Sequence, residues 1–393
     1  MDVLRGVALF GVFLVNMTGF AHVGLMSTES QLDALPTAAW DAVLHDIIDL
    51  LVSDKANTTF AFLFGLGFYL QMSRLETRGV DFTRVYRRRL FVLLAIGALN
   101  FCFLWTWDIL HLYALAGFAL LALRRVSNRT LVVIGVTCAI FGRTAQKTLT
   151  EFTSAATWTG APDPYADAAV LARQALSERG DYPGLVASFL DFAWVDYFAS
   201  GLLIGWIFYA LGRFLLGAWV GRHEWIARSR DFLPGWRQLT RWALPGGLIL
   251  QAIAVALNEA PWVDDFEHRE FFSWALHLVA VPVLAAGYIA GIAVLFNGDR
   301  GRRVLAPFAH VGRMALTNYL AQGFIIAFVL FGVGPGLALA GRIGTCALTA
   351  IVVLGFAAQM IASRWWLERF QYGPMEWVWR ALTYGKRPGM RTR

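Results

Sequence analysis

Residues 2–16 read DVLRGVALFGVFLVN, an apolar run that carries an arginine near its start and an asparagine near its end. Arg5 and Asn16 are eleven residues apart, which is close to three helical turns and about 16 Å, so one helix presents both on one face. Asp2 lies one turn before Arg5 on a nearby face. In one interpretation, Arg5 only anchors a membrane span and Asn16 bonds a neighbouring helix. In the other, both line a polar seam inside a bundle, where Arg5 meets an anionic ligand and Asn16 orients a reacting group.

The composition of the whole chain is typical of an integral membrane protein. Of its 393 residues, 58% are hydrophobic and 16% are charged, whereas a soluble domain carries about 25% charged residues. Several apolar runs approach the roughly 20 residues that cross a bilayer. The first run is not a cleaved signal peptide, because many further runs follow it. We therefore predict an all-α fold, a polytopic helical membrane bundle of about ten transmembrane helices with additional interfacial helices, held in the lipid bilayer.

The hydropathy pattern divides this single membrane domain into two halves. Residues 1–146 hold the first five spans, residues 147–185 form an external loop, residues 186–363 hold the last five spans, and residues 364–393 form a cytoplasmic interfacial tail. The predicted spans are 3–25, 57–74, 88–106, 108–124, 130–146, 186–212, 242–258, 273–296, 314–333 and 341–363.

Arginine-rich and acidic stretches alternate along the chain, which predicts how the bundle is oriented. Four arginine-rich stretches fall on one side of a ten-span arrangement: 74–89, 124–129, 213–241 and the tail from residue 364. The stretches 147–185 and 259–270 are richer in acids and fall on the other side. Basic loops stay in the cytoplasm, so both termini are predicted to be cytoplasmic. The net charge of +7 therefore reflects membrane orientation, and no nucleic-acid partner is expected.

A second group of candidate residues lies at the turn between the third and fourth predicted spans. Residues 105–113 read WTWDILHLY, with Asp108 placed to cap the following helix and His111 one turn later on the same face. A histidine beside a carboxylate can serve as a general base or acid. The alternative is a helix cap next to a histidine at the membrane interface.

The stretch before the second span predicts an amphipathic helix. In residues 40–51, WDAVLHDIIDLL, apolar side chains recur at helical spacing, and Asp41, His45 and Asp49 share the other face. A helix of this kind lies on the outer membrane surface with a solvated polar face. If it instead dips into a site, His45 flanked by two acids is a second candidate for the general base.

Polar residues also recur at the start of the ninth span, where residues 312–322 read GRMALTNYLAQ. Arg313 and Thr317 are four residues apart, as are Asn318 and Gln322. Polar side chains inside a span must find partners within the bundle. These residues either bond neighbouring helices or contribute to a ligand site.

Several kinds of chemistry lose support because their motifs are absent from the sequence. There is no glycine-rich phosphate loop with a lysine, no HExxH motif and no GxSxG motif. Cys102, Cys138 and Cys346 each lie in an apolar run without a neighbour at metal-ligand spacing, so we expect no disulfide and no metal site. Asp191 and Asp196 are further acids at membrane depth, where a carboxylate pairs or takes up a proton.

These motifs resemble those of the YeiB-like family of bacterial membrane proteins, in the family's order along the chain. The matching stretches are DVLRGVALFGVFLVN (2–16), LFGLGF (63–68), DILHLYAL (108–115), GRMALTNYL (312–320) and RFQYGPMEWVWR (369–380). That family is similar in turn to transmembrane acyltransferases, among them heparan glucosaminide N-acetyltransferase and bacterial O-acetyltransferases. The resemblance implies a multi-pass protein of the bacterial inner membrane. It would move an acyl group, acetyl first among them, from cytoplasmic acyl-CoA to an extracytoplasmic hydroxyl or amine, such as one on a saccharide.

The residues that would carry this reaction follow from the resemblance and from charge. Acyl-CoA is a polyanion, so its phosphates are expected to contact cytoplasmic arginines. Its thioester is expected to reach the polar groups in the outer half of the bundle. The candidates for binding acetyl-CoA are Arg5, Arg87, Arg88, Arg313, Asn318 and Gln322. His111 with Asp108, or His45, would take the proton of the acceptor, and Asn16 or Asn318 would donate to the developing oxyanion.

A second hypothesis uses the same polar residues without acyl transfer. Ten spans with buried asparagine, glutamine and aspartate also suit a transporter or exporter of a small molecule or lipid. Binding of acetyl-CoA would favour the enzyme, and alternating access without it would favour transport. A homodimer is compatible with either hypothesis.

Overall fold

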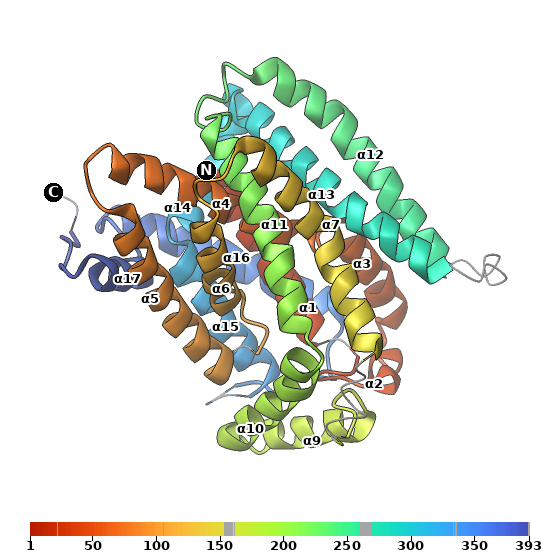
Figure 1. Ribbon diagram of the computed structural model, residues 1–393. Coiled ribbons are helices and arrows are strands. Elements are labelled where there is room, and N and C mark those ends of the chain that lie inside the picture. Colours follow the sequence, from red (N-terminus) through yellow and green to blue (C-terminus); the bar gives the residue numbers. More distant parts are fainter. Residues whose placement is uncertain are drawn as a thin grey trace.

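The chain folds as a bundle of helices (Figure 1). The computed structural model describes residues 1–21, 23–104, 106–152, 160, 162–259, 269–332, 334 and 336–391. Within these residues, extended pairing is limited to two isolated bridges, Val23 with Ser27 and Phe370 with Arg391. The all-α prediction is therefore confirmed.

The first half of the chain forms the helices that surround the site described below. They are α1 (Asp2–Phe20), α2 (Glu29–Asp33), α3 (Ala38–Leu51), α4 (Lys55–Glu76), α5 (Phe82–Phe103), α6 (Ile109–Ala122) and α7 (Asn128–Phe152). Helix α3 covers the predicted amphipathic stretch and packs on α16 (Thr345–Leu367) and α12 (Leu233–Glu259).

The second half begins with the two helices α9 and α10 at one end of the bundle, away from the N-terminus (Figure 1). The remaining elements are α9 (Asp167–Glu178), α10 (Tyr182–Ala193), η1 (Trp194–Ala199), α11 (Leu202–Arg222), α13 (Arg269–Phe296), α14 (Asp299–Arg313), α15 (Ala315–Leu330) and α17 (Pro374–Tyr384). The predicted external loop thus contains α9. Its residues 153–159 and 161, and residues 260–268 of the predicted acidic loop, lie outside the described part.

Five described helices are long and apolar enough to cross a membrane: α1, α11, α12, α13 and α16. The pair α14 and α15 also passes this test as one unit, although it is bent by 82°. Helices α4 to α7 lie where four further spans were predicted, but α4 and α5 carry more polar residues and α6 is shorter.

The predicted sixth span, 186–212, is not one continuous helix. Helix α10 runs into the π-helical turn η1, and Gly201, at φ 74°, then separates η1 from α11. A π-turn places one extra residue in the turn and changes the direction of the side chains after it, and such turns are frequent at functional sites. Here the turn carries Asp196 and Tyr197.

The break between α14 and α15 is held by a residue from the C-terminal helix. Glu376 on α17 accepts hydrogen bonds from the backbone nitrogens of Leu316 at 2.6 Å and Thr317 at 3.1 Å, and from the Thr317 hydroxyl at 2.5 Å. These are donors at the start of α15 that have no partner within their own helix. Burial raises the pKa of Glu376 above its usual range. These hydrogen bonds to Glu376 fix the start of α15, the helix that carries Tyr319.

Helix α1 lies at the centre of the bundle and contacts α4, α14, α15 and α16. Its Leu9, Val12, Phe13 and Met17 are fully buried in the main apolar core. Burial of this kind stabilises the fold by about 1.5–3 kcal/mol for each large apolar side chain. The inner half of α1, between Arg5 and Asn16, is therefore packed on its neighbours.

Candidate functional site

A cavity of about 350 Å³ opens beside the C-terminal half of α1. Its wall combines aromatic rings with hydroxyl, amide and carboxylate groups from several helices. The lining residues are Val15, Asn16, Gly19, Phe20, Ser53, Asp54, Asn57, Trp107, Asp108, Ile109, Leu112, Tyr113, Tyr165, Asp196, Tyr197, Leu202, Trp206, Tyr209 and Ala210. A cavity of this size and mixed lining is the usual form of a small-molecule site.

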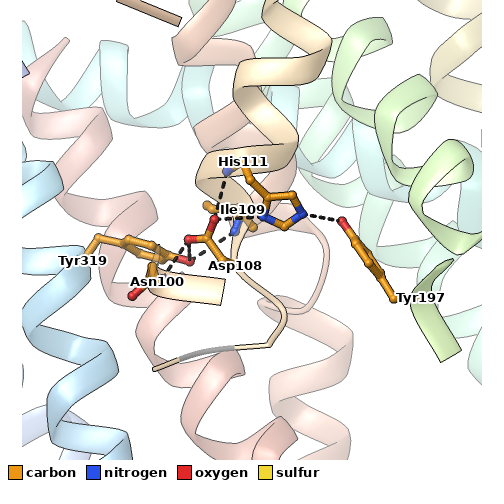
Figure 2. A network of polar contacts seen from close by, with 6 residues as sticks. All are labelled: Asn100, Asp108, Ile109, His111, Tyr197 and Tyr319. Atoms are coloured by element: carbon orange, nitrogen blue, oxygen red, sulfur yellow. Dashed lines mark hydrogen bonds and ion pairs between the residues drawn. The ribbon is translucent and has the colours of Figure 1, made fainter. Parts of the chain in front are cut away.

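Asp108 is the most heavily bonded carboxylate in the cavity wall. It is 2% exposed and caps α6 by accepting from the backbone nitrogen of His111 at 2.9 Å (Figure 2). Its other oxygen accepts from Nδ2 of Asn100 at 2.8 Å and from the hydroxyl of Tyr319 at 3.2 Å. The Tyr319 hydroxyl in turn accepts from the backbone nitrogen of Ile109 at 3.2 Å. Three helices, α5, α6 and α15, thus hold one buried carboxylate in a fixed orientation.

The imidazole ring of His111 lies between Asp108 and a tyrosine, with one ring nitrogen close to each. Nδ1 of His111 lies 3.0 Å from Oδ2 of Asp108, and Nε2 lies 3.0 Å from the hydroxyl of Tyr197 (Figure 2). A proton on Nδ1, donated to Asp108, leaves Nε2 to accept the Tyr197 proton, and Asp108 then stabilises the imidazolium. His111 is 8% exposed, and its ring packs edge-on against Phe101. We call Asp108, His111 and Tyr197 the relay.

The relay depends on an unusually close contact between α5 and α6. A Cβ atom at Gly97 would overlap the backbone nitrogen of His111 and approach its Cα to 2.8 Å. Only glycine lets the two backbones come this near. The contact brings Asn100, one turn further along α5, within reach of Asp108.

A second histidine–aspartate pair stands at another part of the wall. Oδ2 of Asp54 lies 3.0 Å from Nε2 of His277 on α13, and Nδ1 of His277 lies 3.1 Å from Nε2 of Gln251 on α12. Gln251 can donate to Nδ1, so the His277 proton sits on Nε2 and is donated to Asp54. Asp54 has φ 61°, in the left-handed region, at the start of α4. Strain of this kind persists where the surroundings impose it, and it is concentrated at functional sites.

Two lining residues hold acceptor atoms that are not satisfied within the described residues. Oδ1 of Asp196 accepts from the hydroxyl of Tyr165 at 2.6 Å, whereas its Oδ2 is buried without a partner. Oδ1 of Asn57 is buried without a partner as well. A buried acceptor left unpaired costs about 1–3 kcal/mol. Burial and the nearby carboxylate of Asp196 raise the pKa of Tyr165, so its hydroxyl remains the donor.

The structure places the predicted catalytic residues at different distances from the cavity. Asp108 and Asn16 line the cavity, and His111 lies directly behind the wall. His45 is half-buried on α3 and does not line the cavity. Its predicted partner Asp41 instead accepts from Thr37 at 2.6 Å and from the backbone nitrogen of Cys346, also at 2.6 Å, at the start of α16.

Asn318 and Gln322 lie away from the cavity and bond neighbouring helices. Nδ2 of Asn318 donates to the carbonyls of Val311 and Met314 and to Ser363 at 3.0 Å. Nε2 of Gln322 donates to Gln359 at 3.0 Å. These bonds join α15 to α14 and α16 across the break.

The predicted arginines lie near the opposite end of the bundle from the cavity. Arg5 pairs with Asp2 at 3.0 Å and keeps a third of its side chain exposed, and its Nη2 lies close to Gly67. The predicted residues Arg87, Arg88 and Arg313 are exposed. Arg89 is half-buried, packs over the ring of Trp379 at 3.7 Å, and lies close enough to Arg5 and Arg380 to interact with both.

Comparison of the sequence with those of known proteins shows the family of the chain. The family model described as "Protein of unknown function (DUF418)" matches residues 220–386. "Uncharacterized protein YxaH" of Bacillus subtilis (strain 168) is 30% identical over 398 residues, or 98% of this chain and 93% of YxaH. "Uncharacterized protein YeiB" of Escherichia coli (strain K12) is 32% identical over 414 residues, or 98% of this chain and 95% of YeiB. The chain belongs to the YeiB-like family. The "39.9 kDa protein in amylase 3'region" of Bacillus acidopullulyticus is 27% identical, over 98% of this YeiB-like chain.

Sequence reasoning missed four residues of the site, for different reasons. Tyr197 reaches His111 from 86 positions away through a π-turn that no residue pattern signals. Tyr319 lies inside the GRMALTNYL stretch, but Asn318 and Gln322 beside it are the stronger polar signals in an apolar helix. His277 and Asp54 are separated by 223 positions, and only helix packing joins them.

Proposed function

We propose that this protein is a ten-span acyltransferase of the bacterial inner membrane with both termini in the cytoplasm. The ten spans are α1, α4, α5, α6, α7, α10 with η1 and α11, α12, α13, α14 with α15, and α16. An acyl group, acetyl in the simplest case, passes from cytoplasmic acyl-CoA to a hydroxyl or amine on the outer side. The observation that carries the proposal is the relay, whose Asp108 and Tyr197 line one cavity.

The relay supports removal of a proton from the acceptor. As the acceptor attacks the thioester carbonyl, its proton passes to the Tyr197 oxygen, while the Tyr197 proton passes to Nε2 of His111. Asp108 holds the imidazolium that forms. The proton then goes to the sulfur of the departing CoA thiol, so the carbon–sulfur bond breaks as the new acyl bond forms. A general base of this kind is worth roughly 10²–10⁴ in rate.

The oxyanion that develops on the thioester carbonyl needs a donor in the same cavity. Asn16 is the predicted donor that lines it, and one preorganised amide is worth about 3 kcal/mol in such a site. Asn318, the alternative candidate, is engaged with three acceptors between α14, α15 and α16.

The cationic end of the bundle is suited to the CoA phosphates. Arg5 of α1 and Arg89 of α5 lie there close enough to interact, with Arg380 of the C-terminal helix nearby. Arginine binds phosphate through paired, charge-assisted hydrogen bonds. Since the inner half of α1 is packed, the acyl arm can reach the cavity only if the helices around α1 separate, which makes opening of the bundle part of each catalytic cycle.

The leading alternative is a transporter, and one observation favours it. Along α1 the cavity extends only to Val15, and packed core residues separate it from the cationic end of the bundle. A carrier whose substrate site is closed toward one side of the membrane has this arrangement. A carrier would bind its substrate in this cavity and open alternately without consuming acyl-CoA.

Turnover of purified protein distinguishes the two functions. Acetyl-CoA is added with 6-aminohexan-1-ol, which offers one amine and one hydroxyl, and release of free thiol is followed together with mass spectrometry of the alcohol. Acyl transfer predicts equal amounts of thiol and acetylated product, both reduced at least 100-fold in the His111→Gln variant. If the purified protein does not bind acetyl-CoA and does not release thiol, the proposal is contradicted.

A further inference from the structure

The charged residues among those that line the cavity are all aspartates. Asp54, Asp108 and Asp196 line it, and no lysine or arginine is among the described lining residues. Three cations lie behind the wall and are engaged there. Lys55 donates to the carbonyl of Asp49 at 2.7 Å, and Arg213 donates to Thr58 at 2.9 Å. Arg173, near Tyr165, donates to the carbonyls of Leu25 at 2.9 Å and Pro164 at 2.8 Å. A polyanion such as the phosphate end of CoA is therefore unsuited to this cavity.

The three carboxylates differ in how far their charge is already balanced. Asp108 has His111, Asn100 and Tyr319 as donors, and Asp54 has His277. The side chain of Asp196 has a single hydrogen-bond donor within the described part of the chain, Tyr165, and one of its oxygens is buried with none. A carboxylate oxygen that is withdrawn from water and has no hydrogen-bond donor favours a cationic donor as its ligand.

The arrangement of the wall favours an organic cation over a metal ion. No group of three or more histidine, cysteine or carboxylate side chains in the described ranges is close enough to hold a metal. Trp107 and Trp206 line the same cavity, and indole faces attract organic ammonium groups as well as apolar chains. The buried acceptor of Asn57 adds a second position for a ligand donor, so a ligand with more than one N–H or O–H group fits best.

We infer that this cavity binds a primary ammonium compound that carries at least one further hydrogen-bond donor, with the ammonium at Asp196. Its role as acyl acceptor rests on the proposed acyltransferase function. The reaction is then R–NH₃⁺ plus acetyl-S-CoA giving R–NH–acetyl, HS-CoA and H⁺. A carbon–nitrogen bond forms, the carbon–sulfur bond breaks, one proton ends on the thiol and one leaves to the outer side. The neutral amide has lost the charge that held it at Asp196, which favours release.

Binding of two matched ligands tests the inference without any turnover. Titration calorimetry on protein in nanodiscs compares 6-aminohexan-1-ol with hexane-1,6-diol, which has the same length but no charge. We expect the amine to bind at least tenfold more tightly than the diol to the unmodified protein, with the difference shrinking at high salt. Equal affinities would overturn the inference, and this comparison requires no variant to fold.

Two aspartate variants locate the ammonium. Asp196→Asn keeps an oxygen for Tyr165 but loses the charge, and it should abolish the preference for the amine. Asp191→Asn removes an equal charge from an exposed position on α10 that does not line the cavity, and it should retain the preference. If both variants lose the preference for the amine to the same extent, the assignment of the ammonium to Asp196 is overturned. If the amine binds through Asp196 but acetyl-CoA is never consumed, the ligand class stands and the acyltransferase function fails.

Discussion

Replacing Tyr197 by phenylalanine removes one oxygen atom from the relay and leaves the ring in place. Tyr197 is 4% exposed, and its ring contacts with Phe101 and Phe198 do not involve the hydroxyl. The lost interaction is the 3.0 Å hydrogen bond to Nε2 of His111. Such a bond contributes about 0.5–1.5 kcal/mol, and leaving Nε2 buried without a partner raises the cost to about 1–3 kcal/mol. The protein should therefore fold with a slightly lower melting temperature.

The effect of Tyr197→Phe on turnover should be far larger than its effect on stability. Without the hydroxyl, His111 is no longer connected to the cavity, so the rate should fall by roughly 10²–10⁴. The assay is thiol release from acetyl-CoA in the presence of 6-aminohexan-1-ol, beside thermal unfolding of the same samples. Acetyl-CoA affinity should change little, because the relay lies at the opposite end from the arginines.

Tyr288→Phe is the matched control for this variant. The Tyr288 hydroxyl donates to the carbonyl of Leu51 at 2.9 Å and does not line the cavity. Its loss should lower stability by at most about 1 kcal/mol, the usual value of one partly exposed hydrogen bond, without changing turnover. If Tyr197→Phe retains full turnover, or if the two variants slow the reaction equally, the relay is not the base.

Three further changes test other parts of the structure. Gly97→Ala should force α5 from α6 and destabilise the protein by about 1–3 kcal/mol, and thermal unfolding with loss of turnover would check this; an unchanged protein would show that the contact with His111 is not tight. Arg5→Ala should weaken acetyl-CoA binding by about 10-fold or more, since a charged hydrogen bond is worth about 1.5–3 kcal/mol; unchanged affinity in calorimetry removes Arg5 from the site. Burial raises the pKa of Glu376, so the folded protein keeps that proton to a higher pH than the unfolded chain, and stability should fall as pH rises from about 4.3 through the folded pKa. In the Glu376→Gln variant, the melting temperature should depend less on pH in this range. A slope identical to that of the unmodified protein would contradict the raised pKa of Glu376.

The sequence was most informative where a signal is local. Apolar runs predicted the helices, and the three-residue spacing of Asp108 and His111 at a helix start brings their side chains to 3.0 Å. A cap and the residue one turn later are neighbours in any helix, so no tertiary information is needed. The amphipathic helix over 40–51 was predictable for the same reason, as helical periodicity is read directly from the chain.

The parts that could not be predicted depend on how helices pack. Asp41 looked like a partner for His45, but it faces the start of α16, where unpaired backbone donors attract a carboxylate. Asn318 and Gln322 looked like ligand groups, yet the broken helix offers carbonyls and amides that they bond. Tyr197 and His277 enter the site only through the π-turn and the packing of α13 near α4.

Sided proteoliposomes give the most direct measurement of the central claim. Protein is reconstituted with the N-terminal side outward, acetyl-CoA is supplied outside, and 6-aminohexan-1-ol is enclosed in the lumen. The account predicts acetylated product in the lumen and one free CoA thiol outside for each molecule of product, with both lost in Tyr197→Phe. Movement of the unmodified amine across the membrane with no CoA consumed would contradict it.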